Sequence, residues 1–293
     1  MDKIRVEGLT KFYGKTKGIE NVNLVVEEGD FYGFIGPNGD GKSTTIRSLL
    51  GYIKPTSGTG YISGKDITKF SREIRADVGY LPSETTFYKG MRVSDIIKLS
   101  ADLRKKDCST EAKILCDRLS LDTGKKTEQL SFGNRKKLGI VCALQHRPGL
   151  YILDEPTSGL DPLIQKEFFD ILEERNKEGA TIFFSSHVLS EIQKHCHKAA
   201  IIGQGQIIAS GEVESLAKTN AKRIILHGAD RLPVLEGMKD VAQAGGDISF
   251  LYRGDIKKLL EELVKYDFND LSIAEPDLEE IFIHYYEKGG QEK

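Results

Sequence analysis

The sequence predicts an α/β domain with a mostly parallel central sheet, followed by a smaller α+β unit. As far as about residue 213, short apolar runs rich in strand-forming residues alternate with helical patterns, which is typical of α/β domains. Most of these runs are continuously apolar, as strands buried on both faces of a parallel sheet are. From about residue 214 the pattern changes to short strands around a strongly striped helix. We therefore expect two domains, at 1–213 and 214–293.

The strands of the first domain are predicted at residues 31–35, 151–153, 181–185 and 199–202. A helix is expected to begin at Pro162, directly after Asp161, because proline suits the first turn of a helix. The predicted helix runs through Lys177 and is closed by Gly179, since glycine commonly terminates helices. Residues 93–121 show helical patterns only, so we expect a helical insertion at about 84–130.

The second domain is predicted to contain strands at 222–227, 241–245, 248–252 and 268–273. A helix is expected at 256–264, where apolar residues recur at positions i, i+3, i+4, i+7 and i+8. A last helix is expected to start just after Pro276. Together these elements predict a small α+β unit, and a ferredoxin-like arrangement is one that fits them.

The composition excludes some classes of function. The 42 basic and 44 acidic residues leave a formal net charge of −2, so we expect no polyanion-binding surface and no nucleic-acid partner. No stretch approaches the roughly 18 consecutive apolar residues that a membrane helix needs. If the protein works at a membrane, other chains are expected to span it.

The strongest motif is a glycine-rich loop between the predicted strand 31–35 and a helical run, with the pattern G-x-x-x-x-G-K-[ST]. Glycines let backbone N–H groups turn inward around phosphates, and the helix N-terminus adds a positive field. Lys42 is expected to reach the β- and γ-phosphates and Ser43 to bind Mg²⁺. The residues predicted to bind nucleotide here are Gly36, Asn38, Gly39, Gly41, Lys42, Ser43 and Thr44.

Two carboxylates follow the buried strand at 151–153. Asp154 suits the coordination shell of Mg²⁺, directly or through water, and Glu155 suits the polarisation of an attacking water. A strand that ends in two acids is also often only a solvated turn. The glycine-rich loop upstream favours the catalytic interpretation.

Two further positions have a functional and a structural interpretation. Ser131 and Gly133 precede a helical pattern, so they form either an anion site at a helix N-terminus or an ordinary N-cap. His187 follows the strand at 181–185, and a lone histidine is usually structural. It lies, however, at the sheet edge where ligands bind in α/β folds, the same edge as Asp154.

These motifs, in this order, resemble those of the ABC ATPase family, and the resemblance covers essentially the whole first domain. Tyr13 matches the aromatic residue that stacks on adenine, and residues 36–44 match the Walker A loop. Asp154 and Glu155 match the Walker B aspartate and the catalytic glutamate. Residues 130–134 lie at the signature position, residues 158–161 match the D-loop, and His187 matches the switch histidine.

The resemblance implies a P-loop NTPase fold and an ATPase that uses ATP and Mg²⁺. In this family two cassettes, identical or paralogous, sandwich two ATP molecules, and Ser131 and Gly133 then act on the partner's nucleotide. The region from Val213 onward and residues 277–282 resemble ABC-2 type subunits similar to bacitracin-resistance exporters. This implies an export ATPase that drives ABC membrane-spanning subunits through the helical insertion, placed in the cytoplasm on the inner face of the membrane.

Two alternatives remain open at this point. One is a soluble ABC ATPase of translation or DNA repair, although this chain holds one cassette and shows no long coiled-coil insertion. The other is a regulatory switch that binds ATP and hydrolyses it weakly. Glu155 and His187 argue against a switch, whereas Ser83 and Phe132 argue for it.

Three residues depart from the family pattern. Ser83, followed by Glu84, stands where the family has the Gln that reaches Mg²⁺ and the attacking water, so either Glu84 substitutes or coupling is weakened. Phe132 replaces a signature glycine that lies close to the partner's nucleotide. Asp40 stands inside the phosphate loop, where its carboxylate is expected to repel phosphates unless it faces away.

Overall fold

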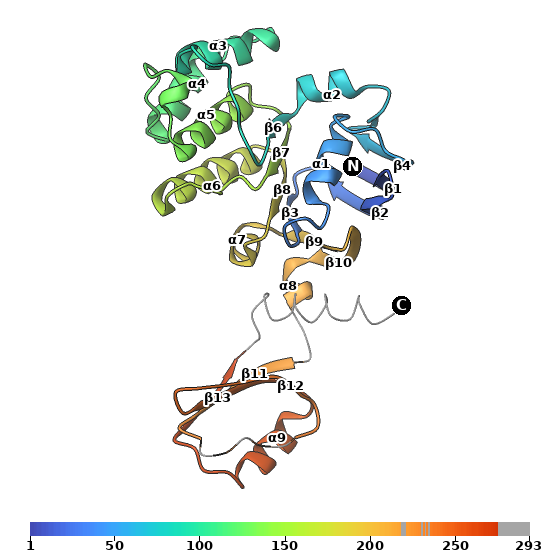
Figure 1. Cartoon of the computed structure of the whole chain (residues 1–293), viewed down its shortest axis with the longest axis vertical. Coiled ribbons are helices and arrows are strands. Elements are labelled where there is room, and N and C mark those ends of the chain that lie inside the picture. Colours follow the sequence, from blue (N-terminus) through green and yellow to red (C-terminus); the bar gives the residue numbers. More distant parts are fainter. Residues whose placement is uncertain (218–220, 230, 232, 234, 275–293) are drawn as a thin grey trace. The chain divides into compact units, whose positions relative to one another are not determined.

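The structure is a computed structural model that describes residues 1–217, 221–229, 231, 233 and 235–274. The chain divides into two compact units, Met1–Val213 and Glu214–Lys293 (Figure 1). The helix expected after Pro276 and the motif at 277–282 lie outside the described residues. No helix among the described residues has both the length and the apolar character required to cross a bilayer.

The first unit is centred on a six-stranded sheet in the order β10-β9-β3-β8-β7-β6. All neighbours in this sheet pair in parallel except β10, which is antiparallel to β9. Its strands are β3 (Phe31–Ile35), β6 (Gly79–Leu81), β7 (Leu150–Asp154), β8 (Thr181–Ser186), β9 (Lys198–Gly203) and β10 (Gln206–Glu212). The predicted α/β fold is confirmed, and the carboxyl ends of β3, β7 and β8 meet at one edge.

A second, antiparallel sheet of the first unit is not among the predicted elements. Its order is β2-β1-β4-β5, with β1 (Asp2–Tyr13), β2 (Thr16–Glu27), β4 (Ser57–Ile62) and β5 (Lys65–Asp66). Along β1 and β2, buried apolar residues alternate with exposed polar ones, as in sheets with one solvated face. The buried face shares one core with α1 and the central sheet, in which Leu9, Ile46 and Phe183 are fully buried.

The helices of the first unit include the predicted insertion. Around the central sheet lie α1 (Lys42–Leu49), α2 (Ser71–Asp77), α6 (Pro162–Lys177) and α7 (Leu189–His195). Within the predicted range 84–130 lie α3 (Val93–Leu103), α4 (Ser109–Arg118) and the short 3₁₀ helix η1 (Thr127–Gln129). Helix α5 (Phe132–Leu144) follows this range, and α3, α4 and α5 gather together in Figure 1. Helix α6 begins as expected, because Asp161 accepts a hydrogen bond from the Ile164 N–H at 3.0 Å and Pro162 occupies the first turn.

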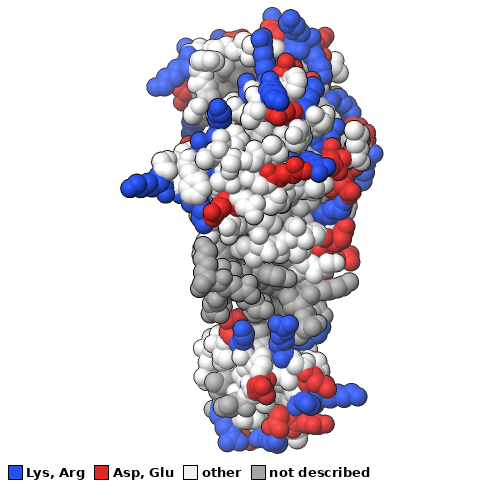
Figure 2. Space-filling view, turned by 90° about the vertical axis from the view of Figure 1, so that its right-hand side faces the viewer, with Lys and Arg blue, Asp and Glu red and all other residues white. Residues whose placement is uncertain are grey.

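The surface of the first unit carries both signs of charge. On the face shown in Figure 2, its Lys and Arg side chains lie among Asp and Glu side chains. This agrees with the near-neutral net charge of −2.

The second unit begins at Glu214, within α8 (Val213–Ala217), and contains an antiparallel sheet in the order β12-β13-β11-β14. Its elements are β11 (Ala221–His227), β12 (Met238–Ala244), β13 (Asp247–Arg253), α9 (Ile256–Leu263) and β14 (Asp270–Ala274). Its core includes Ile224, Phe250 and Leu259. Helix α9 joins β13 to β14, as the second crossover of a ferredoxin-like unit would, and no helix is assigned to the described residues between β11 and β12.

Candidate active site

The candidate site is built on the loop between β3 and α1, residues 36–41. Two of its glycines lie where no side chain fits. A Cβ atom on Gly36 would stand 2.6 Å from the carbonyl oxygen of Ile202, and one on Gly41 would stand 2.8 Å from that of Gly18. Gly41 also has a φ of +102°, which residues with a side chain rarely adopt. Glycine therefore lets the loop pass close to β9 and β2.

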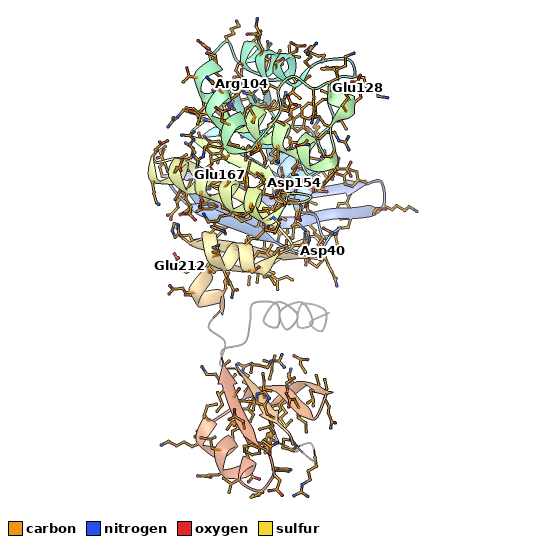
Figure 3. All side chains as sticks on the ribbon, turned by 90° about the vertical axis from the view of Figure 1, so that its left-hand side faces the viewer. Asp40, Arg104, Glu128, Asp154, Glu167 and Glu212 are labelled. Carbon is orange, nitrogen blue, oxygen red and sulfur yellow. The ribbon has the colours of Figure 1, made fainter. Side chains whose placement is uncertain are left out.

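The tip of this loop carries Asn38 and Gly39, both exposed. Gly39 has a φ of +94°, so it too needs the freedom of glycine. The next residue, Asp40, accepts a hydrogen bond on Oδ2 from the Gln204 backbone N–H at 3.1 Å, in the turn between β9 and β10 (Figure 3). The carboxylate within the phosphate loop thus has a structural partner of its own.

Lys42 starts α1 and is only 5% exposed. Its ammonium donates to the carbonyl oxygen of Gly36 at 2.5 Å and to that of Pro37 at 3.1 Å. Ser43 and Thr44 follow in the first turn of α1 and are partly exposed. The Lys42 side chain therefore folds back over the loop that precedes it and binds the backbone at the start of that loop.

The two acids lie at the carboxyl end of β7, beside β8. The Ser185 hydroxyl donates to Asp154 Oδ1 at 2.7 Å and accepts from the Glu155 backbone N–H at 3.1 Å. Glu155 has a φ of +48°, a conformation that costs energy for a residue with a side chain and that is common at functional sites. One serine of β8 thus fixes both acids, and no specific signal in the sequence points to Ser185.

The Glu155 carboxylate joins three separate segments of the chain. Its Oε1 lies 3.1 Å from Lys42 Nζ, and its Oε2 lies 2.7 Å from His187 Nδ1. An ionised carboxylate can only accept, so Nδ1 of His187 is the donor in this hydrogen bond. The imidazole itself is half-exposed, with 47% of its side chain accessible. The structure therefore brings together Lys42, Glu155 and His187, as expected if all three act at one site.

The donor groups of this site fit a magnesium ion. Asp154 is fully buried, and its second oxygen, Oδ2, has no hydrogen-bond partner within the described residues. A buried carboxylate oxygen without a partner is costly, and oxygen ligands are those that Mg²⁺ prefers. With the Ser43 hydroxyl at the start of α1, Asp154 supplies the type of ligand that the ion needs.

Tyr13 lies next to the phosphate loop, at the end of the β1–β2 hairpin. A Cβ atom on Gly18 would stand 2.8 Å from Cε2 of Tyr13 and 3.3 Å from Cγ2 of Thr44. The tyrosine ring and the first turn of α1 therefore flank the same glycine. The ring is 47% exposed and has the Lys11 ammonium 5.2 Å from its centroid. Its exposed face is available to a planar ligand.

The signature residues lie at the start of α5. Ser131 is the N-cap of α5, and its hydroxyl accepts a hydrogen bond from the Asn134 N–H at 3.3 Å. Within this chain, Ser131 therefore acts as an ordinary helix cap. Among the described residues, no hydrogen bond or ion pair joins Ser131 to the phosphate loop of the same chain. The ring of Phe132 packs on Gly159, where an added Cβ would stand 2.2 Å from it, and half of the Phe132 residue surface is exposed. Gly133 also lies close to the carbonyl oxygen of Gly159, since a Cβ atom on Gly133 would stand 2.7 Å from it.

Ser83 and Glu84 follow β6, and a lysine that the sequence did not single out, Lys136, contacts the first of them. Glu84 is exposed, whereas the Ser83 carbonyl accepts a hydrogen bond from Lys136 Nζ at 2.9 Å. Lys136 lies within a run of three basic residues, a pattern typical of a solvated helix face. It shares a helical spacing with buried Gly139, Ile140 and Ala143, and that periodicity was the signal for its burial.

Comparisons with known proteins agree with this geometry. The profile of a family described as ABC transporter matches residues 19–158. A second profile, described as AAA domain, putative AbiEii toxin, Type IV TA system, matches residues 126–192. The two ranges together hold the phosphate loop, both acids and His187.

One relative and two solved structures are similar over most of the chain. The bacitracin transport ATP-binding protein BcrA of Bacillus licheniformis is 35% identical over 294 residues, which cover 96% of this chain and 96% of the relative. The structure of an ATP-binding subunit of an ABC transporter is 29% identical, with a TM-score of 0.68 over 73% of this chain and 91% of the other. The ADP conformation of an ATP-binding cassette of an ABC transporter is 28% identical, with a TM-score of 0.62 over 73% of this chain and 92% of the other.

Proposed function

The chain belongs to the family of ABC transporter ATP-binding proteins, and we propose that it uses Mg-ATP hydrolysis at Lys42 and Glu155 to drive export through separate membrane-spanning subunits. As a member of this family it is the ATP-binding subunit of an ABC transporter and an ATPase. The observation that carries the assignment of residues is the continuous contact from Lys42 through Glu155 to His187. The export direction rests on the similarity to a bacitracin transport protein.

Each residue has a role that follows from its position. The backbone of the phosphate loop and Lys42 hold the β- and γ-phosphates, and Tyr13 offers its exposed ring to the adenine. Glu155 orients the attacking water, and His187 holds the carboxylate through Oε2. Asp154 and Ser43 would hold Mg²⁺, which neutralises phosphate charge when bound. Phosphoryl transfer depends on such positioning and charge stabilisation more than on covalent chemistry.

The active form is proposed to be a dimer in which Ser131 and Gly133 act on the ATP of the partner subunit. The chain has one phosphate loop, and its own signature residues make no hydrogen bond with that loop among the described residues. Two copies, or this chain and a paralogue, would each supply the phosphate loop of one site and the signature of the other. In the cell such a dimer would sit on the cytoplasmic face of the membrane, bound to its membrane subunits.

Complementation between defective subunits tests this proposal. A Ser131→Arg chain and a Lys42→Ala chain should each be inactive, whereas their mixture regains activity because a mixed dimer holds one intact Lys42 facing one intact Ser131. If equal amounts mix at random, half of the dimers are mixed and each has one of two sites, so about a quarter of wild-type activity should return.

The two unmixed variants, measured at the same total concentration, are the control. A mixture that stays inactive while mixed dimers demonstrably form would mean either that Ser131 acts in its own subunit or that the two sites must fire together, whereas a Ser131→Arg chain that is fully active alone would contradict the assignment of Ser131. Mg-dependent ATP hydrolysis by the wild-type chain, or its absence, separates an ATPase from a regulatory switch.

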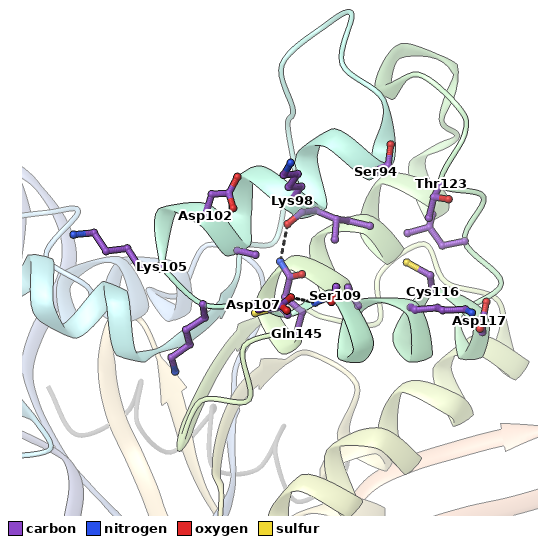
Figure 4. A pocket seen from close by; sticks show the side chains of 17 residues that line it. Ser94, Lys98, Asp102, Lys105, Asp107, Ser109, Cys116, Asp117, Thr123 and Gln145 are labelled. Atoms are coloured by element: carbon purple, nitrogen blue, oxygen red, sulfur yellow. Dashed lines mark hydrogen bonds between the residues drawn. The ribbon is translucent and has the colours of Figure 1, made fainter.

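The contact with the membrane subunit is proposed to lie on the helical insertion, at a pocket of about 880 Å³ between α3 and α4 (Figure 4). Ile97, Ala101 and Ala112 give it an apolar lining, and lysines such as Lys98 border it. Gln145 is 2% exposed in this pocket; its Nε2 donates to the Ile97 carbonyl at 3.0 Å. Its Oε1 has no partner within the described residues. A short helix of the membrane subunit that presents an apolar side chain and a hydrogen-bond donor would satisfy both features.

Co-purification with the cognate membrane subunit tests this contact. Ala112→Trp should fill the pocket and abolish co-purification, while ATP affinity stays unchanged because the phosphate loop is untouched. Ile114→Trp is the matched control, since Ile114 lies on the same helix, is 46% exposed and does not line the pocket. Equal co-purification of both variants would place the contact elsewhere.

A further inference from the structure

A buried lysine connects the helix that carries the signature to the segment after β6. Lys136 is 1% exposed, and its ammonium donates to the carbonyl oxygens of Pro82 at 3.2 Å and Ser83 at 2.9 Å. Burial lowers the pKa of Lys136 to about 8, while the nearby carboxylates of Asp154 and Glu155 favour its charged form. A buried ammonium is unfavourable unless its contacts compensate for lost hydration.

The same face of α5 touches this segment again one turn later. A Cβ atom on Gly139 would stand 2.6 Å from Cγ2 of Thr85 and 2.8 Å from Cδ1 of Leu81. The helix backbone therefore lies directly against residues 81–85. Leu81 pairs with Leu153 in the neighbouring strand β7, which leads into Asp154. One rigid helix thus connects the Ser131 N-cap to the segment that begins beside the two acids.

We propose that Lys136 is a positioning residue, whose ammonium holds the backbone of residues 82 and 83 against α5 so that this segment and the signature loop move together during ATP hydrolysis. The inference rests on the proposed function of the site. Ser83 stands at the position where the family has a Gln that reaches Mg²⁺ and the attacking water. The shorter serine side chain is not expected to reach them, so we infer that another group sets the position of the backbone at residue 83. Lys136 is the buried cation whose contacts do this.

A purely structural lysine and a positioning lysine predict different results for Lys136→Met. Methionine has a similar length and no charge to desolvate, but it leaves the Pro82 and Ser83 carbonyls without this donor, which costs some stability. We expect Lys136→Met to remain folded at the assay temperature, with a melting temperature somewhat below that of wild type, and to bind ATP within about twofold of wild type, because the phosphate loop is unchanged. Its kcat should fall about tenfold, with KM nearly constant, because positioning is lost only in the reacting complex.

Two further variants make the test independent of that single substitution. Lys136→Arg keeps a cation that can donate to two carbonyls and should recover part of the lost turnover. If Lys136→Met does not fold, Lys136→Gln takes its place, since its amide can still donate to one carbonyl. Lys137→Met, at the next and partly exposed position of α5, is the control and should leave kcat unchanged.

A double-mutant cycle with Ser83→Gln then tests whether Lys136 acts through residue 83. The effect of Ser83→Gln on kcat should differ at least threefold between the wild-type and the Lys136→Met backgrounds. Additive effects, an unchanged kcat in Lys136→Met, or a loss of activity that follows a loss of folded protein would each overturn the inference. A wild-type chain without ATPase activity would instead contradict the proposed function itself.

Discussion

Replacement of Glu155 by glutamine separates ATP binding from hydrolysis. The two side chains have the same shape, so the glutamine amide oxygen can still accept from the loop lysine. Its NH2 group then faces His187 Nδ1 and pairs with it when the neutral imidazole carries its proton on Nε2. What is lost is the negative charge that orients and polarises the attacking water. Loss of a group that assists proton transfer lowers rates by about 100-fold to 10,000-fold, or about 3 to 5 kcal/mol in the barrier.

The same change should leave ATP binding intact or strengthen it. The Glu155 carboxylate lies 3.1 Å from Lys42 Nζ, and such a pair attracts by about 5 kcal/mol at an effective dielectric constant of about 20. Most of this attraction is offset by desolvation, and the ammonium also keeps its contacts with Gly36 and Pro37. A net release of about 1 kcal/mol for phosphate binding would tighten Kd roughly fivefold.

The assay measures Kd for Mg-ATP by calorimetry and turnover by phosphate release. Glu155→Gln should give a Kd equal to or below that of wild type and a turnover at least 100-fold lower. Glu84→Gln is the matched control, because Glu84 is an exposed acid near the same segment and the sequence left it open as a substitute. Turnover within a few-fold of wild type, or a loss of turnover in Glu84→Gln alone, would refute the role given to Glu155.

Two other predictions concern polar groups outside the reacting centre. Asp40→Ala removes the hydrogen bond that Asp40 accepts from the Gln204 N–H, so it should lower the free energy of unfolding by about 1 kcal/mol in urea. The Kd for ATP should change less than threefold. A tenfold tighter Kd would mean that the Asp40 charge acts on the phosphates. His146 is 5% exposed, and burial lowers its pKa to about 3 from 6.5. Between these values the unfolded chain binds a proton that the folded chain does not, so stability falls as pH drops, by at most about 1.4 kcal/mol per pH unit. Urea unfolding at several pH values should show a shallower fall for His146→Gln, and equal slopes would exclude His146 as the cause.

The parts of the site that the sequence predicts are those set by short, contiguous patterns. The phosphate loop follows a fully buried strand, and its glycines are required by contacts within a few ångströms of the backbone. The meeting of Lys42, Glu155 and His187 follows from topology, since parallel strands end at the same edge of a sheet. Helix α6 is predicted over its full length, Pro162–Lys177. Asp161 and Pro162 both favour a start at one position, and Gly179 favours an end shortly after Lys177.

The parts that the sequence does not predict depend on contacts between distant residues. The strands of the antiparallel sheet carry polar residues on their solvated face, so their apolar runs are interrupted. The direction of Asp40 is set by Gln204, which is distant in the sequence. Lys136 belongs to a run of three basic residues typical of a solvated face, which masks its helical spacing with the buried residues of α5, and the packing of α5 against Leu81 and Thr85 accompanies its burial.

The position of Phe132 resolves a difficulty that the sequence raises. A phenylalanine in place of a signature glycine is expected to crowd the partner's nucleotide. Its ring instead packs on Gly159 of the same chain, whose φ of +78° and lack of a side chain leave room for the ring. The start of α5 is thereby attached to the loop that follows Glu155 on one side, and through Lys136 to the segment that follows β6 on the other. Because both attachments involve the helix that Ser131 caps, a displacement of the start of α5 would reach both segments beside Asp154 and Glu155 at once.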